Sequence, residues 1–497
     1  MKLMKIASYG EFKRALTEEL TFLRDLKLPV MPDYCFAPEW FAHKAIFLAI
    51  HPKTKELIVH DGVCAKVYAN DELIYSYEHF DKFKPGGKRF AGDTHGAITI
   101  TDSEVYFGGF AYSDVSLSDH NLIFVNKYTH IHRIREDGRT VDLVWHDGPG
   151  TETTYVGEVT DMQYSPKENA VLFTRGDGGA DIWKLDLNTM QVERVTYTHL
   201  SILKMELYDD TIVTGGPDGY GSDGHIVRLN LRDYTVTTYT SAGNYITGTI
   251  EVLRKMSGQV IQYYNRFWAF GSGYAVEIEP KWNWIRMQFP FFRFSRPLMV
   301  VGRRSQKAYV AGVPILAVNP WDTNDEPRAS AGFLLRWDVP VPQIVMQTGY
   351  VSGLATDGKY LYIAGSPQNA LFRGNPVNYE PGRGNIIVMP VSDVFSKPKT
   401  PVIVTDEYAD WAANDIRLGV PLAGFTKKVL KVKAPTAMTL RVYNYYNWPA
   451  SAFVETSDVS LSAGWNTIDL SPYDGIVGIA PTTNITDITY MTLVLIP

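Results

Sequence analysis

Short apolar runs alternate with turn residues through most of the chain, and the pattern is clearest between residues 157 and 240. Runs rich in β-branched and aromatic residues predict strands, and the Pro, Gly, Asn and Asp residues between them predict turns. Two consecutive units share one plan, with Gly-rich joints at 176–179 and 216–219. Their predicted strands are 159–164, 170–174, 181–185 and 191–195, then 203–208, 211–214, 226–230 and 235–240. Four strands in about 40 residues are typical of one β-propeller blade.

Units of similar plan continue on both sides of this segment. Their starts lie near residues 45, 97, 158, 200, 248, 298 and 351, at spacings of roughly 40–60 residues. We therefore expect an all-β fold with a seven-bladed β-propeller over residues 45–405. Rings of six or eight blades also fit the spacing.

The two ends of the chain follow other patterns. Near the N-terminus, Ser8 and Glu11 form a capping box, and the apolar residues that follow recur at helical spacing as far as Leu26, so residues 1–44 are expected to hold a helix and a connector. Residues 406–422 are expected to be a linker. Beyond it, about seven or eight short predicted strands over residues 423–497 favour a C-terminal β-sandwich or jelly roll.

Composition narrows the class of protein. Hydrophobic residues make up 45% of the 497 residues and charged residues 21%, as in globular proteins. The net charge of −6 and the pI near 6.0 argue against a nucleic-acid partner. The two cysteines, Cys35 and Cys64, are either buried small hydrophobic residues, which we favour, or a disulfide. The N-terminal apolar run is too short for a signal peptide, and no run approaches the roughly 20 residues of a transmembrane helix.

The chain carries none of the local motifs that mark common enzymes, such as a phosphate-binding loop, a nucleophile elbow or a His-Glu-x-x-His pair. We therefore expect no catalytic residue, no cofactor and no metal. Several Asp and His residues are close together in predicted loops, either as a cluster at one mouth of the ring or, as we favour, as separate turn residues. These are Asp93 with His95, Asp119 with His120, His146 with Asp147, and Asp223 with His225.

Two further histidines, His130 and His132, fall on one face of a predicted strand. They form either two ligands of a metal site or part of a solvated strand face. We favour the solvated face, because no third ligand is identifiable.

Aromatic residues are dense in the C-terminal domain. Tyr445, Tyr446, Trp448 and Trp465 are the candidate binding residues, because exposed aromatic side chains stack on sugar rings or fill pockets of a partner. The alternative, which we favour slightly, is that they belong to the core of the sandwich. Consecutive strand residues such as Tyr445 and Tyr446 point to opposite faces.

Two segments resemble known families. The run from Trp145 to Gly150, together with Gly157 to Asp161 and the blade after it, resembles an uncharacterised family of archaeal propeller-type proteins over about residues 45–400. That resemblance implies a fold and an archaeal host, and no mechanism. The segment from Leu461 to Leu470 is similar to a strand-turn-strand of carbohydrate-binding jelly rolls and phage tail modules, and it implies a module for surface attachment.

Taken together, these features predict a non-enzymatic structural or attachment protein, on the surface of a virion of a thermophilic archaeal virus or of a cell. Its expected partners are other structural proteins, further copies of itself, and a cell-surface glycan or protein receptor. The chain would be made in the cytoplasm without an export signal. Two alternatives stay open, a propeller enzyme acting on polysaccharide and an intracellular, cytoplasmic scaffold for protein interactions.

Overall fold

The computed structural model describes most of the chain from residue 46 to the C-terminus. The described residues are 46–61, 66–70, 72–76, 91–93, 96–112, 114–118, 121–125, 127–150, 156–176, 181–197, 204–216, 225–240, 256–263, 266–271, 273–278, 285–294, 298–300, 306–320, 332–338, 341–348, 350–366, 385–399, 401–446 and 453–497. The predicted N-terminal helix with its connector (residues 1–44), both cysteines and Trp448 lie outside this part of the chain.

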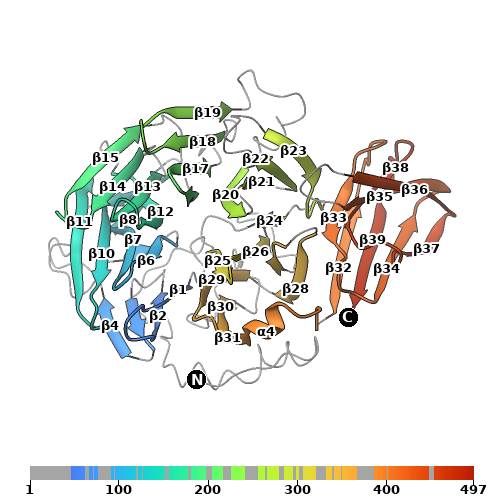
Figure 1. The fold of residues 1–497 in the computed structure, drawn as a ribbon. Coiled ribbons are helices and arrows are strands. Elements are labelled where there is room, and N and C mark those ends of the chain that lie inside the picture. The colour runs from blue at the N-terminus through green and yellow to red at the C-terminus, as the bar shows by residue number, and fades with distance from the viewer. Residues whose placement is uncertain are drawn as a thin grey trace.

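Antiparallel sheets follow one another around a common centre between residues 46 and 390, and their first strands lie nearest that centre (Figure 1). This is the architecture of a β-propeller, as predicted. The described residues contribute seven such sheets, whereas the number of blades in the ring stays a prediction.

The first four sheets hold the strands up to residue 240. The first sheet contains β1 (Ile46–Ile50), β2 (Leu57–Asp61), β3 (Lys66–Ala69) and β4 (Glu72–Ser76). The second contains β5 (Ala91–Asp93), β6 (Ile98–Ile100), β7 (Val105–Tyr112), β10 (Lys127–Ile134) and β11 (Val141–Gly150), beside a hairpin of β8 (Asp114–Ser118) and β9 (Asn121–Val125). The third contains β12 (Glu158–Ser165), β13 (Ala170–Gly176), β14 (Asp181–Asp186) and β15 (Val192–Tyr197), and the fourth contains β16 (Lys204–Tyr208), β17 (Thr211–Gly216), β18 (His225–Asn230) and β19 (Val236–Thr240).

The remaining three sheets complete the series. The fifth contains β20 (Met256–Tyr263), β21 (Arg266–Gly271), β22 (Tyr274–Ile278) and β23 (Ile285–Pro290). The sixth contains β24 (Leu298–Val300), β25 (Ala308–Val310), β26 (Val313–Pro320), β27 (Gly332–Arg336) and β28 (Gln343–Thr348). The seventh contains β29 (Tyr350–Thr356), β30 (Tyr360–Ser366) and β31 (Asn385–Pro390), and the short helix α4 (Val391–Val394) follows it.

The third and fourth sheets confirm the predicted strands to within two residues at every boundary. Their strands read as nearly continuous apolar runs because each sheet is covered on both faces. On β13, Val171 and Phe173 enter the core shared with the second sheet, whereas Leu172 between them enters the core shared with the fourth sheet. All three side chains are buried.

The described residues of the C-terminal domain form a β-sandwich of eight strands. One sheet has the order β32-β39-β34-β37 and the other has the order β33-β38-β35-β36. Numbered along the domain, these orders are 1-8-3-6 and 2-7-4-5, the strand order of a jelly roll. The strands are β32 (Val402–Tyr408), β33 (Arg417–Pro421), β34 (Lys427–Ala434), β35 (Met438–Tyr446), β36 (Phe453–Leu461), β37 (Gly464–Asp469), β38 (Ile476–Pro481) and β39 (Thr489–Ile496).

The predicted boundary between the domains is wrong. Residues 402–405 were expected to end the propeller, but they begin β32, which pairs with β39 from Val402↔Leu495 to Tyr408↔Thr489. Residues 406–422 are likewise no linker, because they hold the end of β32 and all of β33. An apolar strand has the same sequence pattern in a propeller and in a sandwich. Only its pairing with a segment about 90 residues later assigns this strand to the sandwich.

The propeller and the sandwich share one hydrophobic core. Trp268, Phe292 and Trp337 of the propeller belong to the same buried cluster as Leu418 and Val420 of β33. The backbones also meet directly, since Arg293 and Leu418 exchange N–H···O bonds of 2.7 and 2.9 Å. Figure 1 shows the sandwich against the side of the ring formed by β23 and β28. The two domains are therefore packed as one body.

Candidate functional site

The four predicted aromatic residues do not form one surface in the described part of the chain. Trp465 lies on β37 and is 62% exposed. Tyr445 and Tyr446 lie on β35 in the opposite sheet, and both are half-buried. Tyr445 packs against the shared core, and burial raises the pKa of its phenol. Of the three, only Trp465 presents most of its ring to solvent, while Tyr445 is closer to the alternative of a core residue.

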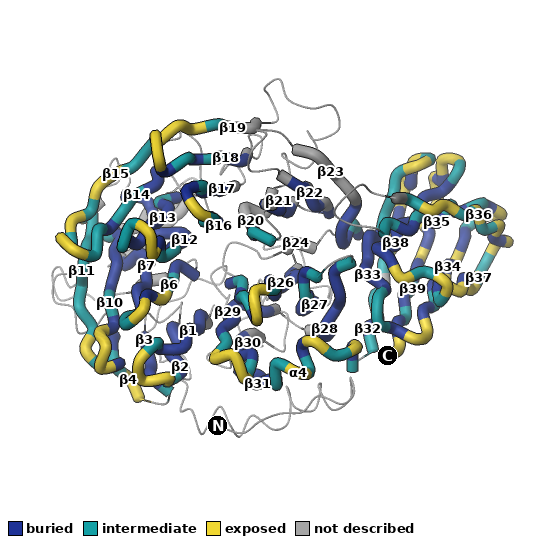
Figure 2. Tube along the Cα trace, viewed as in Figure 1, coloured by how far each residue is buried: buried dark blue, intermediate teal, exposed yellow. Residues whose placement is uncertain are grey.

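Trp465 belongs to a row of side chains that crosses the outer face of its sheet. In the strand register, Trp465 is opposite Lys433 on β34, Lys433 is opposite Tyr490 on β39, and Tyr490 is opposite Glu407 on β32. Tyr490 is 41% exposed, and the Lys433 Nζ lies 5.8 Å from the centre of its ring. Neighbouring strands are about 4.8 Å apart, so the two aromatic residues are separated by about 10 Å. We call these four residues the sandwich row (Figure 2 shows the exposed residues on this part of the sandwich).

Sequence reasoning found Trp465 and missed its neighbours. Lys433 and Tyr490 are 57 positions apart, and only the pairing of β34 with β39 makes them adjacent. The alternation of Lys431 and Lys433 with the apolar residues Leu430 and Val432 was the signal available in the sequence, because it marks one solvated face of a strand.

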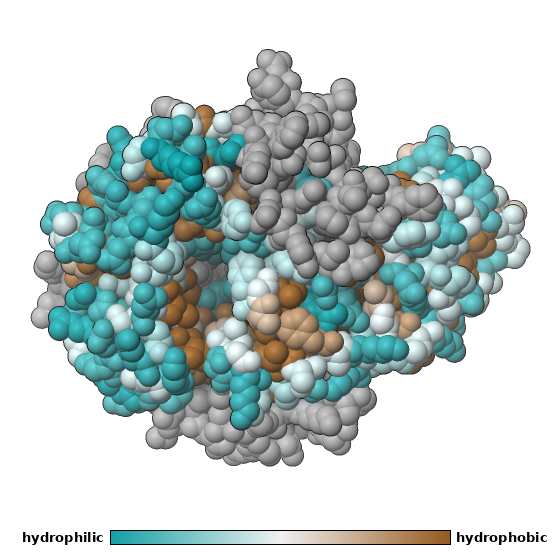
Figure 3. Space-filling model, in the orientation of Figure 1, coloured by the Kyte–Doolittle hydropathy of each residue, from teal (hydrophilic) through white to brown (hydrophobic). Residues whose placement is uncertain are grey.

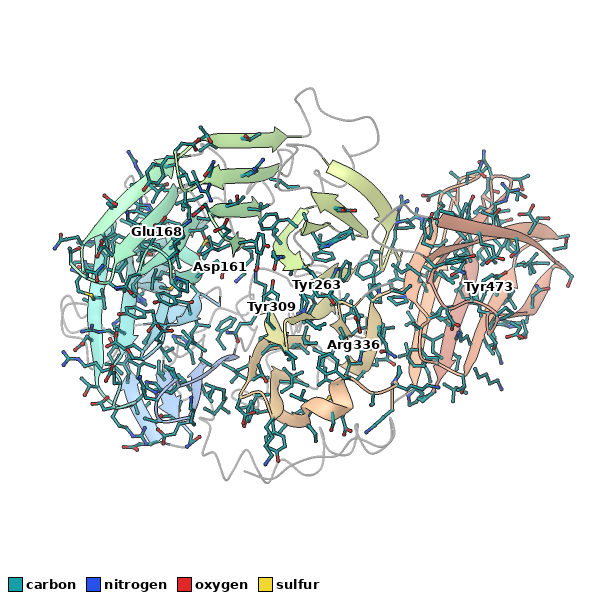
Figure 4. The ribbon with its side chains drawn as sticks, viewed as in Figure 1. Asp161, Glu168, Tyr263, Tyr309, Arg336 and Tyr473 are labelled. Carbon is teal, nitrogen blue, oxygen red and sulfur yellow. The ribbon has the colours of Figure 1, made fainter. Side chains whose placement is uncertain are left out.

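A second candidate site lies at the centre of the propeller. First strands from several sheets enclose a central pocket with a volume of about 420 Å³. Figure 3 shows hydrophobic residues gathered around a hollow in the middle of the ring, and Figure 4 shows Asp161 and Tyr309 near that centre. Its lining residues are Leu48, Ala49, Ile50, Gly96, Ile98, Thr99, Ile100, Asp161, Met162, Gln163, Tyr164, Lys204, Glu206, Gln306, Lys307, Ala308, Tyr309, Leu354, Ala355 and Thr356.

One wall of the central pocket is a buried ionic network. The Lys307 ammonium contacts the Glu206 carboxylate and donates to the carbonyl oxygens of Met205 at 2.8 Å and Val260 at 2.9 Å. The Tyr309 hydroxyl donates to Glu206 at 2.7 Å. Burial raises the pKa of the Glu206 carboxyl, although Lys307 and Tyr309 act in the opposite direction. The network connects the fourth, fifth and sixth sheets across the centre of the ring.

A second pair of charged residues lies in the same pocket. Lys204 is 2% exposed, and its ammonium donates to the Thr160 carbonyl oxygen at 3.2 Å. Burial lowers the pKa of Lys204 to about 8, the nearby Lys307 charge adds to that effect, and Asp161 opposes it. Asp161 itself accepts the backbone N–H of Met205 at 2.8 Å.

Amide side chains join the inner strands of different sheets. Gln163 accepts the N–H of Leu207 and donates to the carbonyl of Met205, both at 2.8 Å. Gln306 accepts the N–H groups of Leu48 at 2.8 Å and Leu354 at 3.1 Å, and it donates to the Leu48 carbonyl at 3.0 Å. Each amide thus takes the place of a neighbouring strand and satisfies backbone groups at an inner sheet edge.

The predicted solvated face at His130 and His132 is wrong. Both side chains are fully buried on β10, because the second sheet is covered on both faces. Their Nδ1 atoms lie 3.1 Å apart, and the His132 Nε2 lies 2.8 Å from the Tyr75 hydroxyl. Burial lowers the pKa of His130 to about 3 and that of His132 well below its ordinary value. The part of the chain that the structure describes holds no group of three His, Cys, Asp or Glu residues able to bind a metal.

The members of the predicted Asp and His pairs that the structure describes lie in three separate strands and not in loops. Asp93, His146 with Asp147, and His225 lie in strands β5, β11 and β18. Asp147 accepts a bond of 2.5 Å from Arg175. The other members, His95, Asp119, His120 and Asp223, lie outside the described residues. No helix among the described residues is long and apolar enough to cross a membrane.

Comparison with known proteins gives a family and no activity. A family model described as "Uncharacterized protein conserved in archaea (DUF2139)" matches residues 58–324. No curated protein sequence matches the chain. Among solved structures, a chain of hydrazine synthase from Kuenenia stuttgartiensis is similar at 10% identity and a TM-score of 0.43, with coverage of 70% of this chain and 96% of that one. The β-propeller domain of the trilobed protease from Pyrococcus furiosus is similar at 12% identity and a TM-score of 0.34, with coverage of 59% and 81%.

Proposed function

Since the chain belongs to a family of uncharacterised proteins conserved in archaea, we propose from its residues and contacts that it is a non-enzymatic attachment protein that binds a surface glycan. The sandwich row is the proposed binding site, and the propeller is its rigid support. The observation that carries the proposal is the exposure of Trp465 and Tyr490 on either side of Lys433.

The spacing of the row suits a polysaccharide. Aromatic rings stack on the apolar faces of sugar rings, and the separation of about 10 Å between Trp465 and Tyr490 follows from two strand spacings. That separation is about two sugar units of an extended chain. The same face carries Lys427, Lys431 and Lys433 against Glu407 and Asp469, so it favours a glycan with carboxylate or sulfate groups.

The shared core supports a mechanical role. A domain on a flexible linker reorients freely, whereas the sandwich buries Leu418 and Val420 against the propeller. A rigid support of this kind holds the row in one direction, which suits repeated display in a symmetric assembly and raises the avidity of a weak site.

The charged groups of the central pocket favour this proposal over a glycosidase. Such an enzyme needs carboxylates free to act as acid and base. The pocket does hold two carboxylates, but Glu206 already contacts Lys307, Tyr309 and Gln163, and Asp161 holds the Met205 N–H. These contacts join different sheets of the propeller, and they leave neither carboxylate free to act as an acid or a base.

The test measures the affinity of the full-length protein for acidic and for neutral polysaccharides. Trp465→Ala is expected to weaken binding by about 2 kcal/mol, or roughly thirtyfold, as for a central aromatic contact. Lys433→Ala is expected to weaken binding less and to flatten its dependence on salt. Tyr446→Ala, on the opposite sheet, is the matched control and leaves binding unchanged. Wild-type affinity in Trp465→Ala, or loss of binding in Tyr446→Ala, would exclude the sandwich row.

We place this activity on a virion or cell surface, with other structural proteins and further copies of the chain as partners. The support is the rigid propeller with its appended sandwich and the likeness of residues 461–470 to surface modules. Mass spectrometry of purified virions and of surface layers from the archaeal host tests this location, and we expect the chain to be present in one of them. Recovery of the chain only from the cytosolic fraction would overturn the proposed location. The proposal of glycan binding would still be decided by the affinity measurements on the variants.

A further inference from the structure

The sandwich row changes in charge from one strand to the next. Trp465 on β37 and Tyr490 on β39 are aromatic, and Lys433 on β34 places a positive charge between them. Glu407 on β32 ends the row with a negative charge. Both charged side chains are exposed, and their strands are two spacings, or about 10 Å, apart. Lys433 and Glu407 therefore act on a bound molecule as two separate charges of opposite sign.

The adjacent row on the same face has the same order on three of these strands. Lys431 lies two residues from Lys433 on β34, which is about 7 Å along the strand. Lys431 is opposite Thr467 on β37 and Thr492 on β39. The side chains of Lys431 and Thr467 are exposed, and that of Thr492 is half-buried. In both rows, a lysine on the middle strand thus lies between two residues without a charge.

We propose that the sandwich row selects glycans by the spacing of their acidic sugars, and this inference rests on the proposed binding of a glycan there. One strand spacing, about 4.8 Å, is close to the length of one sugar unit in an extended chain. Sugars that stack on Trp465 and Tyr490 therefore leave the sugar between them above Lys433. The row binds one acidic sugar at Lys433, with an uncharged sugar on each side. Glu407 disfavours a second acidic sugar two units farther along the chain.

The class of ligand is therefore a polysaccharide whose acidic sugars are sparse. A neutral polysaccharide stacks on the two aromatic rings but gains no attraction from Lys433 and Lys431. A uniformly acidic polysaccharide gains that attraction, but it also places an anion beside Glu407. Two like charges about 4 Å apart in water repel each other enough to lower affinity about fivefold. Glu407 is thus the residue that excludes the wrong ligand, as unfavourable charge pairs do at other selective interfaces.

Pectins test the inference, because methyl esterification removes acidic groups without changing the sugar backbone. The affinity of the full-length protein is measured at low salt for polygalacturonate, in which every sugar is acidic, and for fully esterified pectin, in which none is. The third ligand is a pectin in which isolated acidic sugars lie between esterified ones. Per acidic sugar, this pectin is expected to bind about fivefold more tightly than polygalacturonate. Fully esterified pectin is expected to bind more weakly than the pectin with isolated acidic sugars.

Two variants each remove one negative charge from an exposed position of the sandwich. Glu407→Gln should raise the affinity for polygalacturonate about fivefold, because the repelled sugar then faces a neutral side chain. Glu455→Gln, on β36 of the opposite sheet, is the matched control and should leave this affinity unchanged.

Two outcomes would overturn the inference alone. They are an unchanged affinity for polygalacturonate in Glu407→Gln, and tighter binding of polygalacturonate than of the pectin with isolated acidic sugars by the wild type. Pectin binding that Trp465→Ala weakens would in both cases still support the sandwich row as a glycan site. If Trp465→Ala weakens no pectin binding, the inference and the sandwich row are both wrong.

Discussion

The buried pair of Lys307 and Glu206 makes the sharpest prediction about stability. Replacing Lys307 by Met keeps an unbranched side chain of similar length and removes the charge next to Glu206. Loss of one partner of a buried pair costs about 3–5 kcal/mol, because the other charge stays buried without compensation. The two carbonyl oxygens of Met205 and Val260 also lose their donor, which places the loss at the upper end of that range.

The loss of stability in Lys307→Met should depend on pH, and the direction of this dependence follows from the pKa of Glu206. Burial already raises the pKa of this carboxyl in the wild type. An acid whose pKa is raised on folding stabilises the fold at pH values below its unfolded pKa, and that contribution is lost as the pH rises through the folded pKa. Without Lys307 the pKa rises further, so the variant protonates Glu206 at mild acid pH. Lys307→Met should therefore lose less stability at pH 5 than at pH 7.

Urea unfolding followed by tryptophan fluorescence at both pH values measures these free energies. The double variant Lys307→Met with Glu206→Gln should recover part of the loss, since it no longer buries an unpaired charge. Lys167→Met is the matched control, because Lys167 is mostly exposed and Asp210 keeps its second partner, Arg232, so the loss is expected to be less than about 1 kcal/mol. A loss below about 1 kcal/mol in Lys307→Met at pH 7, or equal losses at both pH values, would refute the reasoning.

Three further predictions concern other contacts that hold the fold. Gln306→Ala should destabilise the propeller by about 1–3 kcal/mol in urea, because backbone groups of Leu48 and Leu354 lose their partner. Gly419→Ala should loosen the sandwich and expose the junction to limited proteolysis, since its φ is +68° and an added Cβ would lie 2.4 Å from the Pro290 carbonyl oxygen. Folding lowers the pKa of His130 to about 3 from an unfolded value of about 6.5. Neutral His130 therefore stabilises the fold above about pH 6.5, and this contribution is lost as the pH falls toward 3. In His130→Phe the urea midpoint of unfolding should consequently change less between pH 7 and pH 4 than it does in the wild type.

The fold was largely predictable because its signals are local. The strands between residues 157 and 240 are bounded by Gly, Pro and Asn turns, and each was placed to within two residues. The boundary at residue 405 was not predictable, because the partner of β32 is β39 at the other end of the domain. The local sequence indicates where turns form, because turn residues are adjacent in the chain, but it does not indicate which distant strands pair.

The candidate sites depend on the same distinction. Trp465 was found as an aromatic residue next to a turn, but Lys433 and Tyr490 join it only through strand register. The ionic network of the central pocket was missed entirely, because Glu206 and Lys307 come from separate sheets and neither belongs to a local motif. Full burial of His130 follows from coverage of both faces of its sheet, which a single strand pattern does not show.

Hydrogen–deuterium exchange of the full chain with a bound acidic oligosaccharide tests the central claim most directly, because it locates the binding face without any substitution. Binding at the sandwich row predicts new protection in the peptides that contain β34, β37 and β39. It also predicts that peptides from β35, β36 and the inner strands of the propeller keep their exchange rates. Protection confined to β35 and β36, or to the lining of the central pocket, would contradict the account.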